Sequence, residues 1–202
     1  MENKKVAVFG VGRVGLPLAL VLADKGFQVT GVDVDPFRIS LLKHKIMPFL
    51  EEGADPLLEK HSDKNFQIFS KEHSGRVISE NEVIIITLGT PIDDTYSPSF
   101  SEIEELMSQF APYIQSDQLI IFRSTLSPGA TEQLIKQIEN QTKLKLGETI
   151  FIAYCPERIA EGKSIEELKT IPQIIGTLDD KSAQKAAVIF ETIAPTILFT
   201  NP

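Results

Sequence analysis

The sequence predicts an α/β protein built on a doubly wound, mainly parallel β-sheet with helices on both faces. Short apolar segments alternate with amphipathic helical patterns along most of the chain. Several apolar segments, such as Val83-Ile84-Ile85-Ile86, lack the apolar–polar alternation of a half-exposed strand. Parallel strands that are covered on both faces have this uniform character. We expect residues 1–202 to form one domain.

The strands are expected where apolar, β-prone residues lie between turn signals. The expected strands are Val6–Phe9, Gln28–Asp33, Val83–Leu88, Leu119–Phe122, Ile150–Tyr154, Gln173–Gly176 and Thr196–Thr200.

Amphipathic helices are expected between these strands. One stripe follows the i, i+3, i+4, i+7 rule, and Ser99 with Glu102 resembles a capping box at its start. The polar stretch from Glu51 to Lys64 is expected to be an irregular surface region. The two helical stripes are Ile103, Leu106, Met107, Phe110, Ala111 and Ile114, and then Ala183, Ala186, Ala187 and Phe190.

Composition restricts the function classes. A net charge of -8 argues against nucleic acid as a partner, because phosphate backbones require clustered lysine and arginine. No apolar segment approaches the ~18 residues of a membrane span, and the N-terminus lacks the shape of a signal peptide, so we expect a cytoplasmic protein without a membrane partner. The single Cys155 cannot form an internal disulfide. No metal site is expected, because His44, His61 and His73 are scattered without ligand spacing.

A glycine-rich turn follows the first strand and precedes a helix that should end near Lys25. Its G-x-G-x-x-G pattern is typical of Rossmann dinucleotide-binding domains, in which the first glycine permits the turn, the second admits the pyrophosphate and the third allows close packing. The pyrophosphate would lie at the helix N-terminus, where free N–H groups favour anions. The turn consists of Gly10, Val11, Gly12, Arg13, Val14 and Gly15.

An acidic residue ends the second strand. Asp33 lies 18 residues after Gly15 (33 − 15), a distance at which a carboxylate can accept hydrogen bonds from an adenosine ribose. A carboxylate there would repel the extra phosphate of NADP, so NAD is the expected cofactor. FAD, which binds the same turn, and a purely structural turn are the alternatives.

With the later motifs added, the chain resembles the NAD-binding domain of the UDP-glucose/GDP-mannose dehydrogenase family, from Val6 to the C-terminus. AYCPER is most similar to the branch that oxidises UDP-N-acetylmannosamine. The segments that carry the resemblance are GVGRVGLPLA (10–19), VDVDPFRI (32–39), PFLEEG (48–53), the TP of TLGTPIDD (87–94), STLSPGATE (124–132) and YCPERIAEGKSIEEL (154–168).

The resemblance implies cofactor contacts beyond the glycine turn. Arg38 would flank the adenosine ribose, although a solvated helix-surface arginine is the alternative. Thr90 and Pro91 follow a strand and should face the cofactor. Ser124 and Thr125 follow the next strand, and Thr125 would hold a water or a carboxylate near the reacting centre. The two hydroxyls could instead cap a helix.

The resemblance also implies catalytic residues. Glu157 would take part in acid–base chemistry, helping water to attack a thioester, and Glu161 would touch cofactor or substrate. A surface salt bridge is the alternative for Glu157. Cys155 lies in the wrong motif to be the family's nucleophile and is expected to pack in the core. Pro17, about one turn into a helix, is a family marker that helix propensity does not explain.

By the resemblance, the family's catalytic lysine, asparagine and nucleophilic cysteine lie in motifs that this sequence lacks. The sequence also lacks the family's UDP-binding domain. We therefore expect a truncated form or a naturally short protein, which binds NAD without turning over a UDP-sugar. The full-length protein is expected to be a homodimer and this chain a monomer. Alternatives from other classes are a stand-alone NAD-sensing domain and a β-hydroxyacid dehydrogenase.

Overall fold

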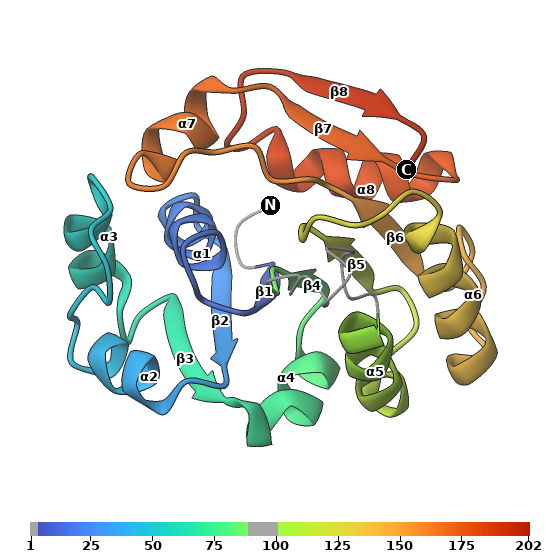
Figure 1. Ribbon diagram of the computed structural model, residues 1–202, viewed down its shortest axis with the longest axis horizontal. Coiled ribbons are helices and arrows are strands. Elements are labelled where there is room, and N and C mark those ends of the chain that lie inside the picture. The colour runs from blue at the N-terminus through green and yellow to red at the C-terminus, as the bar shows by residue number, and fades with distance from the viewer. Residues whose placement is uncertain (1–3, 89–100) are drawn as a thin grey trace, which may run out of the picture.

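A computed structural model describes residues 4–88 and 101–202 and confirms the predicted α/β fold (Figure 1). The described residues form an eight-stranded sheet in the order β3-β2-β1-β4-β5-β6-β7-β8. The first six strands in this order are parallel, β6 pairs with β7 in antiparallel fashion, and β7 and β8 are parallel. The strands are β1 (Lys5–Phe9), β2 (Gln28–Asp33), β3 (Phe66–Ser70), β4 (Val83–Ile86), β5 (Leu119–Phe122), β6 (Phe151–Tyr154), β7 (Gln173–Gly176) and β8 (Ile197–Thr200).

Helices cover both faces of the sheet, and Figure 1 shows α4 and α5 on the opposite side from α1 and α8. Apolar residues of α1, α2, α3, α7 and α8 pack in one core, and those of α4, α5 and α6 pack in the other. The helices are α1 (Gly15–Asp24), α2 (Pro36–Lys43), α3 (Ala54–His61), α4 (Ser74–Glu80), α5 (Ser101–Phe110), α6 (Ala130–Thr142), α7 (Ser164–Thr170) and α8 (Asp180–Phe190), with short 3₁₀ turns at Lys71–His73 and Ala111–Tyr113.

Strand β3 is absent from the sequence-based prediction. Within the described sheet it forms one edge and lies next to β2. Phe66 and Ile68 are buried, whereas Gln67 between them is exposed. An edge strand with one covered face alternates in polarity, and over five residues this alternation is a much weaker signal than the continuous apolar runs of the central strands.

The expectation of an irregular surface from Glu51 to Lys64 is wrong. Residues Ala54–His61 form α3, whose residues Ala54, Leu58 and His61 are buried. Gly53 precedes the helix with φ of 78°, a conformation that glycine adopts without strain. The polar composition conceals a helix that buries only one narrow stripe.

The position of Pro17 has a simpler explanation than the sequence suggested. Helix α1 begins at Gly15, which places Pro17 in the first turn. The N–H groups of a first turn have no partner within the helix, so a proline there removes no helical hydrogen bond. The helix ends at Asp24, close to the predicted end near Lys25, and Gly26 follows with φ of 90°. The proposed cap residue Ser99 lies outside the described residues.

Candidate dinucleotide-binding site

The glycine-rich turn lies where the strand order of the sheet reverses. Strand β1 pairs with β2 on one side and with β4 on the other, and the chain leaves β1 directly into the turn. Connections diverge to opposite faces of the sheet at such a point, which opens a crevice at the carboxyl ends of the strands. The predicted cofactor residues therefore lie at the position where α/β sheets bind ligands.

Two glycines of the turn are required by close packing. Gly10 has φ of +88°, and a Cβ there would lie 2.9 Å from the carbonyl oxygen of Thr87. A Cβ on Gly15 would overlap the carbonyl oxygen of Gly10. The Thr87 hydroxyl lies 3.0 Å from the Phe9 carbonyl oxygen and 2.5 Å from that of Gly10, so it can donate to either. Thr87, which directly follows β4, thus stabilises the turn through a hydrogen bond from its hydroxyl.

Gly12 is different, because a Cβ there would meet no protein atom within 4 Å. The protein's own packing therefore leaves the space beside Gly12 open. This matches the role predicted from the sequence, in which the second glycine lets a pyrophosphate approach the backbone.

Asp33 connects the turn to the next strand. Its side chain is buried, and its Oδ2 accepts a hydrogen bond of 2.8 Å from the backbone N–H of Val11, while Oδ1 accepts one of 2.9 Å from Asp35. Nη1 of Arg38 lies 2.9 Å from both oxygens. The protein's own donors thus engage both oxygens, so a ribose hydroxyl would share an oxygen with Arg38 or displace it.

A cavity of about 330 Å³ opens beside these residues. Sequence reasoning missed part of its wall. Leu106 and Phe110 looked like ordinary core residues of their helix, and Lys71 and Ser74 follow the strand that was not predicted. The cavity is lined by Phe9, Gly10, Gly12, Val32, Asp33, Val34, Arg38, Lys71, Ser74, Thr87, Leu88, Leu106 and Phe110.

These residues fit the adenosine part of NAD. The walls are largely apolar, as an adenine ring requires, and Asp33 and Arg38 supply polar groups that suit a ribose. Backbone N–H groups at the start of α1 and the open space at Gly12 suit a pyrophosphate. The pattern of two closed glycines and one open glycine therefore fits the dinucleotide.

Arg13 joins the glycine turn to a distant loop. Its Nη1 lies 3.5 Å from Oε2 of Glu161, and its guanidinium lies 5.3 Å from the centre of the Phe49 ring. Both charged side chains are more than half exposed, so the ion pair contributes little stability. The ion pair shows instead that two predicted cofactor residues, Arg13 and Glu161, lie close together.

The predicted catalytic residues follow neighbouring strands at the same edge. Ser124 and Thr125 come after β5, and Glu157 comes after β6. Thr125 is exposed, whereas Ser124 is buried and its hydroxyl has no hydrogen-bond partner in the described part of the chain. Glu157 is half-buried and accepts a hydrogen bond from the backbone of Ile159. Among the hydrogen bonds of residues 4–88 and 101–202, none joins Thr125 to Glu157. Thr90 and Pro91 lie outside the described residues.

A buried arginine, Arg123, directly follows β5 and contacts the backbone after β6, and sequence reasoning missed it. Arg123 is 2% exposed, and its Nη1 donates to Oε1 of Gln173 at 2.9 Å and to the carbonyl oxygen of Cys155 at 3.4 Å. Burial lowers the pKa of the guanidinium, because desolvation disfavours the charged form, and the nearby Glu157 opposes this effect. An isolated arginine after an apolar strand carries no sequence signal for burial.

Cys155 packs in the core, as predicted. Its side chain is fully buried, and this burial raises the pKa of the thiol to about 12. The nucleophilic form of cysteine is the thiolate, which is scarce at neutral pH when the pKa is this high.

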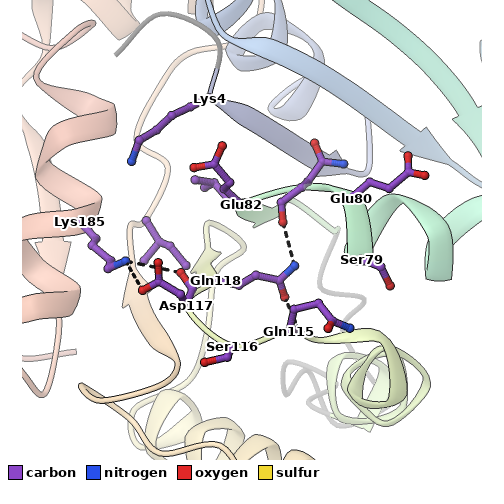
Figure 2. Close-up of a pocket in the computed structure, with 12 residues that line it drawn as sticks. Lys4, Ser79, Glu80, Glu82, Gln115, Ser116, Asp117, Gln118 and Lys185 are labelled. Carbon is purple, nitrogen blue, oxygen red and sulfur yellow. Dashed lines mark hydrogen bonds and ion pairs between the residues drawn. The ribbon is translucent and has the colours of Figure 1, made fainter.

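A second cavity, of about 270 Å³, lies at the amino ends of β4 and β5 (Figure 2). Lys185 reaches into it and lies 2.7 Å from Oδ1 of Asp117. Gln118 donates to the carbonyl oxygens of Ile78 and Asn81 at 2.6 and 2.8 Å.

Among the described helices, none has the length and apolar character that a membrane-spanning helix requires.

Comparison with known proteins agrees with the architecture of this site. A family model described as the UDP-glucose/GDP-mannose dehydrogenase family, NAD binding domain, matches residues 4–194. The chain belongs to this family. NAD, rather than FAD, is therefore the cofactor, and the chain is the NAD-binding domain of an oxidoreductase family.

Within the family, the chain is similar to UDP-N-acetyl-D-mannosamine dehydrogenases. A UDP-N-acetyl-D-mannosamine dehydrogenase of Methanocaldococcus jannaschii is 31% identical over 94% of this chain and 43% of its own length. The structure of UDP-D-ManNAc dehydrogenase from Pyrococcus horikoshii superimposes with a TM-score of 0.91 at 28% identity, over 98% of this chain and 47% of that one. The chain thus spans about half the length of these relatives.

A 3-hydroxyisobutyrate dehydrogenase from Mycobacterium tuberculosis matches less well, with a TM-score of 0.69 at 17% identity over 100% of this chain and 55% of that one. That likeness shows a shared fold alone. The family assignment therefore favours the nucleotide-sugar enzymes over the β-hydroxyacid dehydrogenases considered from the sequence.

Proposed function

We propose that this chain is the cofactor-binding part of an enzyme that oxidises the C6 alcohol of a UDP-sugar to a uronic acid, using two NAD. The observation that carries the cofactor part of the proposal is the hydrogen bond from the Val11 N–H to the buried Asp33 carboxylate, and the family assignment supports the reaction. This hydrogen bond joins the glycine turn to the acid of the second strand at the point where the strand order reverses. NAD supplies the hydride acceptor when it is bound.

Each part of the site has a role in this proposal. The backbone at Gly12 and the start of α1 hold the pyrophosphate, while Asp33 and Arg38 hold the adenosine ribose. The carboxylate of Asp33 disfavours a phosphate on that ribose, so NAD is preferred to NADP. Glu161, Ser124, Thr90 and Pro91 complete the cofactor contacts.

The catalytic wall in the proposal consists of Glu157 and Thr125. Glu157 is half-buried after β6, a setting in which a carboxylate can exchange a proton with a water. Thr125 offers an exposed hydroxyl after β5 that can hold this water or a substrate carboxylate. The nucleophilic cysteine and the lysine that the family resemblance implies are not among these residues.

For the substrate we propose UDP-N-acetylmannosamine, with UDP-glucose as the alternative. The support is the similarity to the UDP-N-acetylmannosamine dehydrogenases of M. jannaschii and P. horikoshii and the AYCPER segment at 153–158. By itself, the 202-residue chain is proposed to bind NAD without turning over the sugar, because the cysteine and lysine are supplied by other segments in the family.

Calorimetric titration tests the cofactor part of this proposal. We expect saturable binding of NAD and much weaker binding of NADP. A chain that binds neither, or that prefers NADP, would contradict the proposed cofactor site. Incubation with NAD and UDP-N-acetylmannosamine tests the second part, and sustained production of NADH by this chain alone would overturn the expected inactivity.

A further inference from the structure

Glu51 is a buried carboxylate that the cofactor site does not use. It is 2% exposed and lies just before α3, in the stretch that the sequence analysis expected to be irregular and at the surface. A buried carboxylate is costly unless hydrogen bonds compensate for the lost water. The partners of Glu51 therefore indicate what it stabilises.

In the described part of the chain, the three groups that donate to this carboxylate come from one segment more than a hundred residues away. Oε2 of Glu51 accepts hydrogen bonds from the N–H of Gly162 at 3.1 Å and from the Ser164 hydroxyl at 2.9 Å, and Oε1 accepts one from the N–H of Ile165 at 3.3 Å. The N–H of Glu52 donates in return to the Gly162 carbonyl oxygen at 3.1 Å. Hydrogen bonds to a carboxylate are about twice as strong as those between neutral groups.

The segment held in this way completes the loop that carries the proposed catalytic glutamate. No helix or strand forms between Cys155 and Lys163. The loop is fixed at its start, where the N–H of Cys155 donates to the Phe122 carbonyl oxygen at 2.8 Å. Its other end is fixed by Glu51. Glu157 and Glu161 lie between these two attachments.

The segment before α3 that contains Glu51 also approaches the glycine turn. Phe49 lies beneath the Arg13 guanidinium, which pairs with Glu161. Residues 49–52 therefore contact both the glycine turn and the loop of residues 156–163. A displacement of this loop would move Glu157 and Glu161 relative to the turn.

We propose that Glu51 is a positioning residue, which holds the loop of residues 156–163 in register with the dinucleotide turn so that Glu157 and Glu161 face the site. The proposal rests on the proposed function for the roles of these two glutamates. The attachment itself depends only on the described contacts.

Amide hydrogen exchange on the 202-residue chain tests the attachment. Glu51→Gln keeps the size of the side chain but replaces one acceptor oxygen with an NH2 group, which cannot accept a backbone hydrogen bond. We expect exchange across residues 157–165 to accelerate about tenfold, the scale of one lost hydrogen bond to a charged group. Glu52→Gln is the matched control, because this neighbouring side chain is exposed, and it should leave these rates unchanged.

Two further variants keep the test decisive. Ser164→Ala removes one donor and retains the carboxylate, so it should accelerate the same amides by a smaller factor even if Glu51→Gln folds poorly. Glu51→Asp keeps the charge on a shorter side chain and should restore part of the protection. Unchanged exchange in both Glu51→Gln and Ser164→Ala, or a loss of protection spread evenly over the whole sheet, would overturn the local role.

Titration with NAD separates this inference from the proposed function. Because Asp33 still supports the turn while the loosened loop carries Glu161, a proposed cofactor contact, Glu51→Gln should weaken NAD binding only modestly, by about fivefold, the scale of one hydrogen bond. Glu52→Gln should bind NAD like the unaltered chain. Failure of the unaltered chain to bind NAD would contradict the proposed function and leave the exchange result to decide the role of Glu51. Complete loss of NAD binding in Glu51→Gln would indicate damage to the glycine turn itself, and an NAD affinity equal to that of the unaltered chain would remove Glu161 from the positioned contacts; either result would contradict the positioning role as proposed.

Discussion

The two ends of the parallel strands, called here the carboxyl edge and the amino edge of the sheet, carry cavities of similar size but opposite character. The carboxyl edge has a cavity of about 330 Å³ beside the glycine turn, and the amino edge has one of about 270 Å³ between β4, β5 and α8 (Figure 2). At the carboxyl edge, α1 begins and an open backbone lies at Gly12. At the amino edge, the polar groups of Lys185, Asp117 and Gln118 already bind one another or the backbone.

The difference follows from the direction of the chain. In a parallel sheet every strand leads into a helix at its carboxyl end, so helix N-termini with free N–H groups gather there. Helices end at the other edge, where α4 ends at Glu80. Around that cavity the acidic Glu80, Glu82 and Asp117 outnumber the basic Lys4 and Lys185. An anionic cofactor is therefore favoured at one edge and disfavoured at the other. Size alone would not distinguish the two cavities.

The largest effect is expected from the glycine turn. Gly15→Ala places a methyl group against the Gly10 carbonyl, which should lower the free energy of unfolding by roughly 1–3 kcal/mol, the usual cost of overpacking, and abolish NAD binding. Denaturant unfolding and calorimetry measure the two effects. Gly12→Ala is the control, because its methyl group meets no protein atom within 4 Å. It should unfold normally yet bind NAD poorly, and normal NAD binding would argue against a pyrophosphate at this position.

A smaller effect on affinity is expected from Asp33→Ala. The change removes an acceptor for Val11, Asp35 and Arg38 and for the proposed ribose, so NAD binding should weaken by roughly 1–3 kcal/mol. Asp117→Ala removes a carboxylate from the opposite edge, where it pairs with Lys185. Calorimetry should find its NAD affinity unchanged, and equal losses in the two variants would remove the distinction between the edges.

The amino edge should respond in stability rather than in binding. Gln118 is buried, donates to two backbone carbonyl oxygens and accepts a hydrogen bond of 2.8 Å from the Gln115 N–H. Gln118→Ala should lower the free energy of unfolding by about 1–3 kcal/mol, because buried backbone groups lose their partners. The folded variant should bind NAD normally. A parallel loss of NAD affinity would show that the two edges are coupled.

The smallest effect on NAD affinity is expected at Cys155. A pKa of about 12 keeps the thiol protonated, so a thiol reagent at pH 8 should modify it only after unfolding. Because the unfolded thiol ionises near its ordinary pKa of 9.0, unfolding releases a proton above that pH, and stability should fall as pH rises from about 9 toward about 12. Cys155→Ala should remove this pH dependence and leave NAD titration unchanged, whereas rapid modification of the folded chain would contradict the core role.

Sequence patterns were sufficient to predict an element where residues close together in the sequence also determine which side chains are buried. The continuous apolar run at Val83–Ile86 and the glycine turn before α1 are local signals, and both lie where they were expected. Asp33 could be placed at the turn because its spacing from the glycines reflects the fixed length of a strand–helix–strand unit. The fold and the cofactor edge follow from such signals.

Other features depend on contacts between segments that are distant along the chain, and only the tertiary structure decided them. The burial of Glu51 depends on donors from residues 162–165, and the burial of Arg123 depends on Gln173 and Cys155. A charged residue in the sequence looks the same whether water or the protein supplies its partners. The order of apolar residues and glycines along the chain determined the architecture, whereas the hydrogen bonds that satisfy its buried charges exist only once the chain has folded.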